Sequence, residues 1–469
     1  QLLTAQQQLS TLNFSVIILI SGVDGGGKGE VINLLNEWLD PRFMRTNAYD
    51  SSSDEEKERP KFWRFWRTMP AKGTIGIYVG SWYSDPIAQR VHKDTKEADL
   101  QLQLTQIKQL EQELADDGTL IIKCWLHLKK DQQKKRLKLL ENNPETAWQV
   151  TNRDKKHLKI YDDFARVAET VLKETSSTQN PWRIIDGSDI RYSSLTVGQR
   201  VLDKIKAHIA AHELKQSMPV PTRSAPIIHG NQPKILDSLD LSLELDKKDY
   251  NEKLKFYQGK LNKLARYAHQ KKTSSVLVFE GWDAGGKGGA IRRLTRALDS
   301  RNYQVIPIAA PTDEEQVQHY LWRFWRHMSR AGRITIYDRS WYGRVLVERV
   351  EGFASEQEWT RAYSEITNFE KSLTDHGIVL LKFWLHIDPD EQLRRFKERE
   401  KISYKQHKIT EEDYRNRDKW AEYSLAVNDM VAHTSSQKTS WTLVEANNKR
   451  YARIKFIKTY CEALEKALD

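Results

Sequence analysis

Short apolar runs alternate with amphipathic stretches along the whole chain. In the second half, runs of strand length predict strands at residues 275–280, 303–308, 333–337, 379–385 and 441–445. The segments between them, apolar at every third or fourth position, predict helices at 287–298, 313–328, 356–374, 389–400, 411–432 and 451–467. Short apolar strands separated by helices are typical of a parallel sheet with helices on both faces. Such a sheet binds ligands where its strands end at their carboxyl edge.

The chain also repeats itself. Three motifs recur 259 positions further on: GVDGGGKG at 22–29 as GWDAGGKG at 281–288, WRFWR at 63–67 as WRFWR at 322–326, and YVGSWY at 78–83 as YDRSWY at 337–342. With 469 residues, the chain has the length of two domains. We therefore expect a tandem duplication of one α/β domain.

The domain boundaries follow from the positions of the prolines. Between the copies, prolines interrupt every helical or strand pattern, which predicts a linker at 218–233. The first domain is then expected at 1–217 and the second at 234–469. A charged segment at 246–272 carries apolar residues at helical spacing, so we expect it to form a helix that lies against the second domain.

The composition is that of a globular protein, with 39% hydrophobic and 30% charged residues. The longest apolar run, at 16–20, is far too short to cross a membrane, so no membrane partner is expected. The two cysteines, Cys124 and Cys461, lie in different copies and form no disulfide framework. A reducing compartment follows, and we expect a cytoplasmic protein.

The formal net charge of +11 favours a polyanionic partner, although a basic surface can also serve solubility alone. The sequence contains no recognisable nucleic-acid-binding module, so nucleic acid is not the expected partner. Polyphosphate or nucleotides fit the glycine motifs better. The sequence leaves the oligomeric state open, a homo-oligomer included.

The repeated glycine motif has the context of a phosphate-binding loop. In the second copy it follows an apolar strand and precedes a helix, as such a loop requires. Glycines let backbone N–H groups surround a phosphate, and the helix N-terminus and the lysine add positive charge. The phosphate-binding residues expected in this loop are Gly281, Gly285, Gly286, Lys287 and Gly288.

This loop departs from the usual one in a way that bears on metal binding. The Ser or Thr that normally follows the lysine and binds Mg²⁺ is replaced by Gly288, and Asp283 has appeared inside the loop. Mg²⁺ prefers oxygen ligands, so Asp283 is the candidate replacement. The alternative is that Asp283 only caps the following helix or stabilises the turn.

A second candidate carboxylate, Asp338, ends the strand at 333–337, where a Walker-B residue holds Mg²⁺ near the phosphates. Arg339 and Arg344 follow closely, and their guanidinium groups are suited to gripping phosphoryl oxygens. Glu348 is suited to orienting one of them, although a surface ion pair explains it equally well.

The first copy lacks this group of residues. At the positions of Asp338, Arg339 and Arg344 it has Val79, Gly80 and Asp85. A metal ligand and two positive charges are lost together, so we expect the first domain to be inactive.

Two further basic segments are candidates for phosphate binding. In WRFWR, Trp322 and Trp325 share one helical face and are expected in the core, whereas Arg323 and Arg326 form either a solvated face or a polyphosphate track. A dense basic stretch follows, with Arg394, Arg395, Lys397, Arg399, Lys401, Lys405, Lys408, Arg415 and Arg417. It is either a solvated helix face or a lid that closes on the phosphates. Arg417 is the strongest candidate because its Asn-Arg-Asp context is repeated.

The motifs GWDAGGKGG, WRFWRHM, YDRSWYGRVLVERV and KFWLHI closely resemble the polyphosphate kinase 2 family, and the resemblance covers both halves. It implies two P-loop kinase-like three-layer domains with a mainly parallel sheet and a helical lid, Mg²⁺ as cofactor, and phosphoryl transfer between inorganic polyphosphate and nucleotides. Two-domain members are typically polyphosphate:AMP phosphotransferases with a catalytic C-terminal domain. The resemblance makes Lys287 the phosphate-binding lysine, Asp283 and Asp338 metal-linked carboxylates, Arg339 and Arg344 phosphate contacts, and Arg417 a lid residue, with Glu348 in the matching VERV segment.

The expected activity is therefore transfer of a terminal phosphoryl group from polyphosphate to AMP, giving ADP. Three alternatives stay open: an ADP-phosphorylating polyphosphate kinase, an ATP-dependent small-molecule kinase, and a polyphosphate-binding protein without turnover. Phosphoryl transfer needs positioning and charge neutralisation, and no protein nucleophile. His386 has a counterpart, His127, in the first copy and is expected to be structural.

Overall fold

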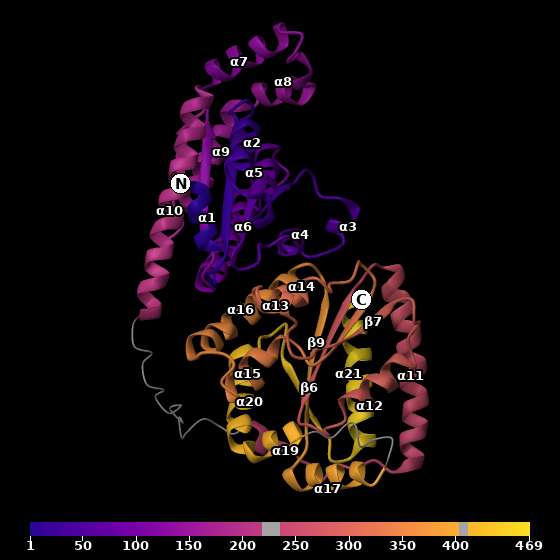
Figure 1. Ribbon diagram of the computed structural model, residues 1–469. Coiled ribbons are helices and arrows are strands. Elements are labelled where there is room, and N and C mark those ends of the chain that lie inside the picture. Colours follow the sequence, from indigo (N-terminus) through magenta and orange to yellow (C-terminus); the bar gives the residue numbers. More distant parts are fainter. Residues whose placement is uncertain (218–234, 403–410) are drawn as a thin grey trace. The chain divides into compact units, whose positions relative to one another are not determined.

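The computed structural model describes residues 1–217, 235–402 and 411–469 (Figure 1). The predicted linker at 218–233 lies outside the described residues, as do Lys405 and Lys408 of the basic stretch. The chain forms two compact units. The first comprises the described residues of Gln1–Ser53, Arg64–Ala225 and Thr312–Trp322, and the second those of Asp54–Trp63, Pro226–Pro311 and Arg323–Asp469.

The second unit contains a five-stranded parallel sheet, which confirms the predicted fold class. Its strands are β6 (Ser275–Gly281), β7 (Tyr303–Pro307), β8 (Ile334–Asp338), β9 (Val379–His386) and β10 (Trp441–Glu445), in the order β10-β9-β6-β8-β7. All five predicted strands are present within one or two residues at each end. The central strand β6 pairs with β8 and β9, and its residues from Ser275 to Glu280 are buried on both faces.

Helices cover both faces of this sheet. The longer ones are α11 (Lys247–Gln270), α12 (Lys287–Thr295), α16 (Glu356–Asp375), α17 (Pro389–Glu400), α19 (Glu411–Asp418), α20 (Trp420–Thr434) and α21 (Lys449–Leu468). The shorter ones are η3 (Ile235–Ser238), η4 (Trp341–Val345) and α15 (Val347–Val350). In Figure 1, α12 and α21 lie on one side of β6 and β9, and α16 and α20 lie on the other. The predicted helix at 246–272 is α11, which packs along α21 and bonds to α12 through Gln258 and the Arg293 carbonyl.

Two predicted helices are wrong in their extent. The segment 313–328 forms two single turns, α13 (Asp313–Gln316) and α14 (Trp322–Trp325). Residues 312–322 pack in the first unit and the chain from Arg323 onward in the second, so two different cores divide a segment that reads as one amphipathic helix. The helix predicted at 411–432 is interrupted at Lys419, between α19 and α20. Within α14, Trp325 is buried against Phe369, as predicted for a core residue.

The first unit repeats the same sheet. Its strands are β1 (Val16–Gly22), β2 (Met44–Ala48), β3 (Ile75–Val79), β4 (Leu120–His127) and β5 (Trp182–Asp186), all parallel and in the order β2-β3-β1-β4-β5. The helices of the first half are α1 (Leu2–Leu9), α2 (Lys28–Trp38), η1 (Pro41–Phe43), α3 (Asp54–Lys57), α4 (Trp63–Trp66), α5 (Ser84–Val91), α6 (Glu97–Asp116), α7 (Lys130–Asn142), η2 (Ala147–Gln149), α8 (Asn152–Lys159), α9 (Tyr161–Thr175) and α10 (Ile190–Ser217). The predicted tandem duplication is thus present as two sheets of one topology.

Each unit has a buried, fully bonded lysine in the strand that follows its central strand on one side, Lys382 in β9 beside β6 and Lys123 in β4 beside β1. In the second unit, Lys382 Nζ donates to Glu370 (2.8 Å), to the Tyr342 hydroxyl (2.9 Å) and to the Thr434 carbonyl (2.7 Å). Lys123, at the equivalent position, makes the same three kinds of contact in the first unit. The interior ion pair survives in both copies, so it is a structural feature and does not distinguish an active unit from an inactive one. No helix in the described ranges is long and apolar enough to cross a membrane.

Candidate active site

The glycine loop joins β6 to α12 with an unusual backbone. Gly281 has φ +149°, and a Cβ atom there would meet the Leu385 carbonyl oxygen at 2.6 Å, so only glycine fits. Helix α12 begins at Lys287, and its N-cap is Gly286, with φ +113° and no hydrogen bond from any described side chain. An uncapped helix N-terminus that follows a glycine loop is a ready anion-binding site.

A cavity of about 610 Å³ opens beside this loop. Seven of the predicted site residues line it: Asp283, Gly285, Gly286, Lys287, Gly288, Asp338 and Arg339. Asp338 reaches the loop because β8 pairs with β6 and places Asp338 opposite Phe279. Strands β6 and β8, which end 57 residues apart in sequence, at Gly281 and Asp338, therefore end at the same edge of the sheet.

Asp283 is held by two partners at this edge. Its Oδ1 lies 3.3 Å from Arg339 Nη2, and its Oδ2 accepts a hydrogen bond from Asn416 Nδ2 at 3.1 Å. The cap of α12 is made by Gly286, so the alternative of Asp283 as a helix cap is wrong. The carboxylate instead borders the cavity together with Asp338.

The remaining predicted residues lie outside the lining of this cavity. Arg344 pairs with Glu348 at 3.1 Å, and Arg323 lies close enough to favour the ionised form of Glu348. Burial nevertheless raises the pKa of Glu348 above its ordinary value. Arg326 is exposed in the turn that follows α14, and Arg417 donates to the Pro389 carbonyl and to Gln392.

Besides Arg395, which is described below, four cations that line the same cavity were missed by the sequence prediction or were given no specific role in it. They come from three helices: Arg292 of α12, Arg399 of α17, and Lys449 and Arg453 of α21. The first copy has Asn33, Leu140, Ile190 and Ser194 at these positions. A comparison of the two copies position by position carries the signal that would have found them.

The sequence prediction did not single out Glu280 and named no partner for His386, two buried residues near the loop. Glu280, the last residue before the loop, is buried and accepts a hydrogen bond from Ser340 at 2.8 Å; the first copy has Ser21 there. Burial raises the pKa of Glu280, against the opposing charge of Lys287. His386 accepts from Trp282 Nε1 at 3.1 Å, and burial lowers its pKa to about 4, which keeps the imidazole neutral.

Arg339 occupies a strained backbone conformation. Its φ is +66°, in the left-handed region that costs a side-chain-bearing residue about 1 kcal/mol. The first copy has Gly80 there, with almost the same φ of +68°. The second unit thus retains a destabilising residue at the edge of the cavity, which is common at functional sites.

Replacement of Arg339 separates this strain from the function of its side chain. We expect Arg339→Gly and Arg339→Ala both to lose at least about tenfold in catalytic rate, because both lack the guanidinium group. Arg339→Gly should unfold about 2–4 °C higher than Arg339→Ala, since only glycine relieves the left-handed strain. Calorimetry of the two variants measures the difference, and equal melting temperatures would contradict a strained backbone.

These features define a kinase-like phosphotransferase fold, present twice, in which a parallel sheet carries a phosphate-binding loop after its central strand. The family model for "Polyphosphate kinase 2 (PPK2)" matches residues 1–213 and again residues 244–469. The chain belongs to the polyphosphate kinase 2 family.

Relatives match along nearly the whole chain. A protein of Pseudomonas syringae pv. tomato named polyphosphate:AMP phosphotransferase is 50% identical over 96% of this chain and 90% of its own length. One of Acinetobacter johnsonii with the same name is 39% identical over 97% and 92%. The crystal structure of a putative polyphosphate kinase 2 from Pseudomonas aeruginosa is 48% identical, with a TM-score of 0.88 over 99% of this chain and 93% of that one.

Proposed function

We propose that the second unit transfers a terminal phosphoryl group from inorganic polyphosphate to AMP, giving ADP. The observation that carries this proposal is the cluster of four cations, Arg292, Arg399, Lys449 and Arg453, in the cavity bordered by Lys287 and Asp338. A cluster of positive charges in a cavity beside a phosphate loop suits a polyanion with many phosphate groups. The names of the relatives with nearly full coverage support AMP as the acceptor.

The residues act by positioning and by neutralising charge. The N-terminus of α12 and Lys287 hold the phosphates, and Arg339 contributes a guanidinium at the junction of loop and strand. This arrangement lowers the barrier because phosphoryl transfer spreads negative charge over the oxygens of the moving group. The reaction requires no protein nucleophile.

The two cavity carboxylates fit Mg²⁺. Asp283 and Asp338 both border the cavity, and no group of three or more His, Cys, Asp or Glu in the described ranges is placed to hold a metal. Two carboxylates suffice for Mg²⁺, which takes its other ligands from phosphates and water. When bound, the ion supplies charge neutralisation between phosphate oxygens.

We infer that the first unit does not catalyse. It has Val79 and Gly80 at the positions of Asp338 and Arg339, and it lacks the four cavity cations. Its loop carboxylate, Asp24, pairs with His157 Nδ1 at 2.5 Å. Both cysteines are buried and unpaired, which fits a reducing compartment and supports a cytoplasmic enzyme.

The deciding experiment incubates the protein with long-chain polyphosphate, Mg²⁺ and either AMP or ADP, and separates the nucleotide products. ADP formed from AMP supports the proposal. Conversion of ADP alone would keep the family and change the acceptor. Turnover with ATP but not with polyphosphate would indicate a small-molecule kinase, and salt-sensitive polyphosphate binding without any product would indicate a binding protein.

A further inference from the structure

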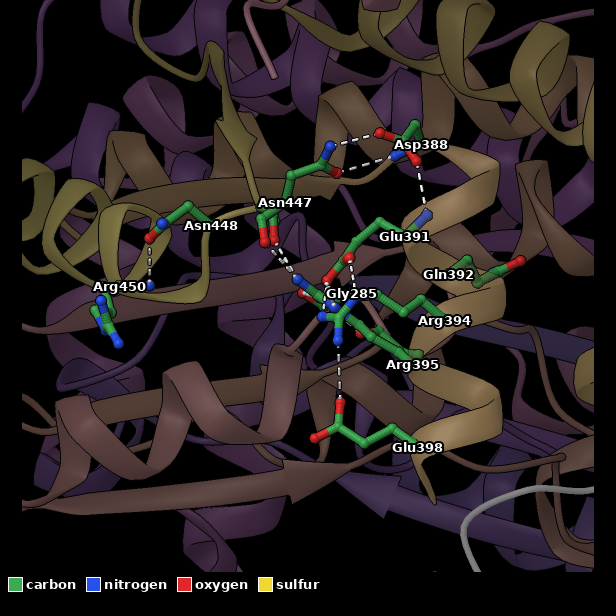
Figure 2. A network of polar contacts seen from close by, with 12 residues as sticks. Gly285, Asp388, Glu391, Gln392, Arg394, Arg395, Glu398, Asn447, Asn448 and Arg450 are labelled. Atoms are coloured by element: carbon green, nitrogen blue, oxygen red, sulfur yellow. Dashed lines mark hydrogen bonds and ion pairs between the residues drawn. The ribbon is translucent and has the colours of Figure 1, made fainter. Parts of the chain in front are cut away.

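Arg395 of α17 lies in the middle of the basic stretch, but its side chain is buried. It is 2% exposed, the most buried arginine of the described core, and Figure 2 shows its guanidinium at the centre of a polar network. All three of its nitrogens are used. Such a buried, fully bonded guanidinium can fix several chain segments at once.

The network ties α17 to two loops. Nη1 donates to the carbonyls of Ala284 (2.9 Å) and Gly285 (3.1 Å) in the phosphate loop. Nη2 donates to the carbonyls of Ala446 (2.6 Å) and Asn447 (2.9 Å), which connect β10 to α21. Nε pairs with Glu391 one helical turn earlier, at 2.5 Å.

Bonds around the network extend its reach. The Asn447 side chain exchanges hydrogen bonds with the backbone and carboxylate of Asp388, the N-cap of α17 (Figure 2). Gln392, one turn away from Asp388, donates to the Asp283 carbonyl at 3.1 Å. The start of α17 therefore holds three consecutive carbonyls of the phosphate loop, those of residues 283, 284 and 285.

The first copy has the equivalent arginine without the pairing carboxylate. Arg136 stands at the position of Arg395, but Gln132 replaces Glu391. Arg136 bonds the Gly187 carbonyl (2.8 Å) and lies 3.7 Å from Glu30, and among the described residues it donates to no carbonyl of its loop. Its side chain is 17% exposed, against 2% for Arg395. Gln132 instead caps its own helix by accepting from the Lys129 backbone.

We propose that Arg395, held by Glu391, is a positioning residue that sets the phosphate loop of the active unit. A trans peptide points its C=O and its N–H in opposite directions. Fixing the Gly285 carbonyl on Arg395 therefore fixes the Gly286 N–H, at the N-cap of α12, on the opposite side. The Gly285 N–H closes the loop turn on the Trp282 carbonyl. Arg395 acts on the reaction through these peptides, an inference that rests on catalysis in the second unit.

The test is Arg395→Lys, which keeps the charge and loses the planar fork that spans the two loops. We expect kcat to fall roughly 10- to 100-fold at a temperature well below unfolding, because a small displacement of a phosphate-binding group has that effect. The KM for polyphosphate should change less than about threefold, since the charge in the cavity remains. Amide hydrogen exchange across 281–288 should accelerate, with β6 unchanged.

Two further variants make the test independent of folding. Arg136→Lys, the matched control in the first copy, should leave kcat and the exchange of residues 281–288 at their wild-type values. Glu391→Gln recreates the pairing of the first copy without removing Arg395, and should accelerate exchange in the same loop and lower kcat in the same direction. If Arg395→Lys does not fold, Glu391→Gln decides the question.

Two outcomes would overturn the proposal. A rise in the KM for polyphosphate with unchanged loop exchange would make Arg395, which also borders the cavity, a direct ligand contact. Unchanged kcat in a folded, less stable variant would make it a purely structural residue. If the wild-type protein does not use polyphosphate, the proposed function fails, whereas accelerated loop exchange in Arg395→Lys still supports the positioning role.

Discussion

Lys287→Ala is expected to lower kcat/KM for polyphosphate and AMP by about 10³-fold, whereas Lys28→Ala should leave most of the activity. Removing a lysine ammonium group that neutralises the transferring phosphoryl group costs about 4 kcal/mol of transition-state stabilisation in such sites. The two lysines are a matched pair. Lys287 Nζ bonds the Gly281 and Trp282 carbonyls, and Lys28 Nζ bonds those of Gly22 and Val23.

Each lysine bonds the same two carbonyl positions of its own loop, and Lys28 also pairs with Asp24 at 3.7 Å. Loss of either lysine should therefore disturb its own loop to a comparable degree. The difference in activity between the two variants therefore reports which loop carries the chemistry. Steady-state kinetics of both variants, with circular dichroism to confirm folding, measures it. Equal losses would show that both loops contribute, and would overturn the assignment of catalysis to the second unit.

Asp338→Asn should lower kcat by about 10²- to 10³-fold while leaving polyphosphate binding almost unchanged. The amide keeps the size of the side chain and its place at the end of β8, but it removes the negative charge that a metal requires. The residual activity should need a higher Mg²⁺ concentration. A titration of activity against Mg²⁺ and a binding assay with labelled polyphosphate separate the two effects.

Asp24→Asn is the control for this variant, since Asp24 is a loop carboxylate of the first unit paired with His157. It should change neither kcat nor the Mg²⁺ requirement. Wild-type turnover by Asp338→Asn at every Mg²⁺ concentration would exclude Asp338 as a metal ligand. Polyphosphate binding that Asp338→Asn leaves unchanged, with no product formed by the wild type, would favour a binding protein.

The sequence by itself determined the duplication and the five strands of the second sheet, and it predicted seven of the residues that line the cavity beside the glycine loop. Strands are short apolar runs, and the loop residues from Gly281 to Gly288 are contiguous. Both can therefore be recognised from neighbouring residues in the sequence. Asp338 was found for the same reason: it ends a strand, and parallel strands end at one edge. The loss of Asp338 and Arg339 from the first copy is equally readable from aligned positions.

Only the tertiary structure decided which charges enter the site. A run of arginines on a helix does not reveal which face is buried, so Arg395 and Arg399 look alike in sequence. Both border the cavity, but Arg395 is buried and donates to the carbonyls of the phosphate loop. Arg292, Lys449 and Arg453 come together from helices that are about 160 residues apart. The segment 313–328 shows the same limit, because two cores share it. Local pattern fixes the elements, whereas burial and contact depend on which faces the fold brings together.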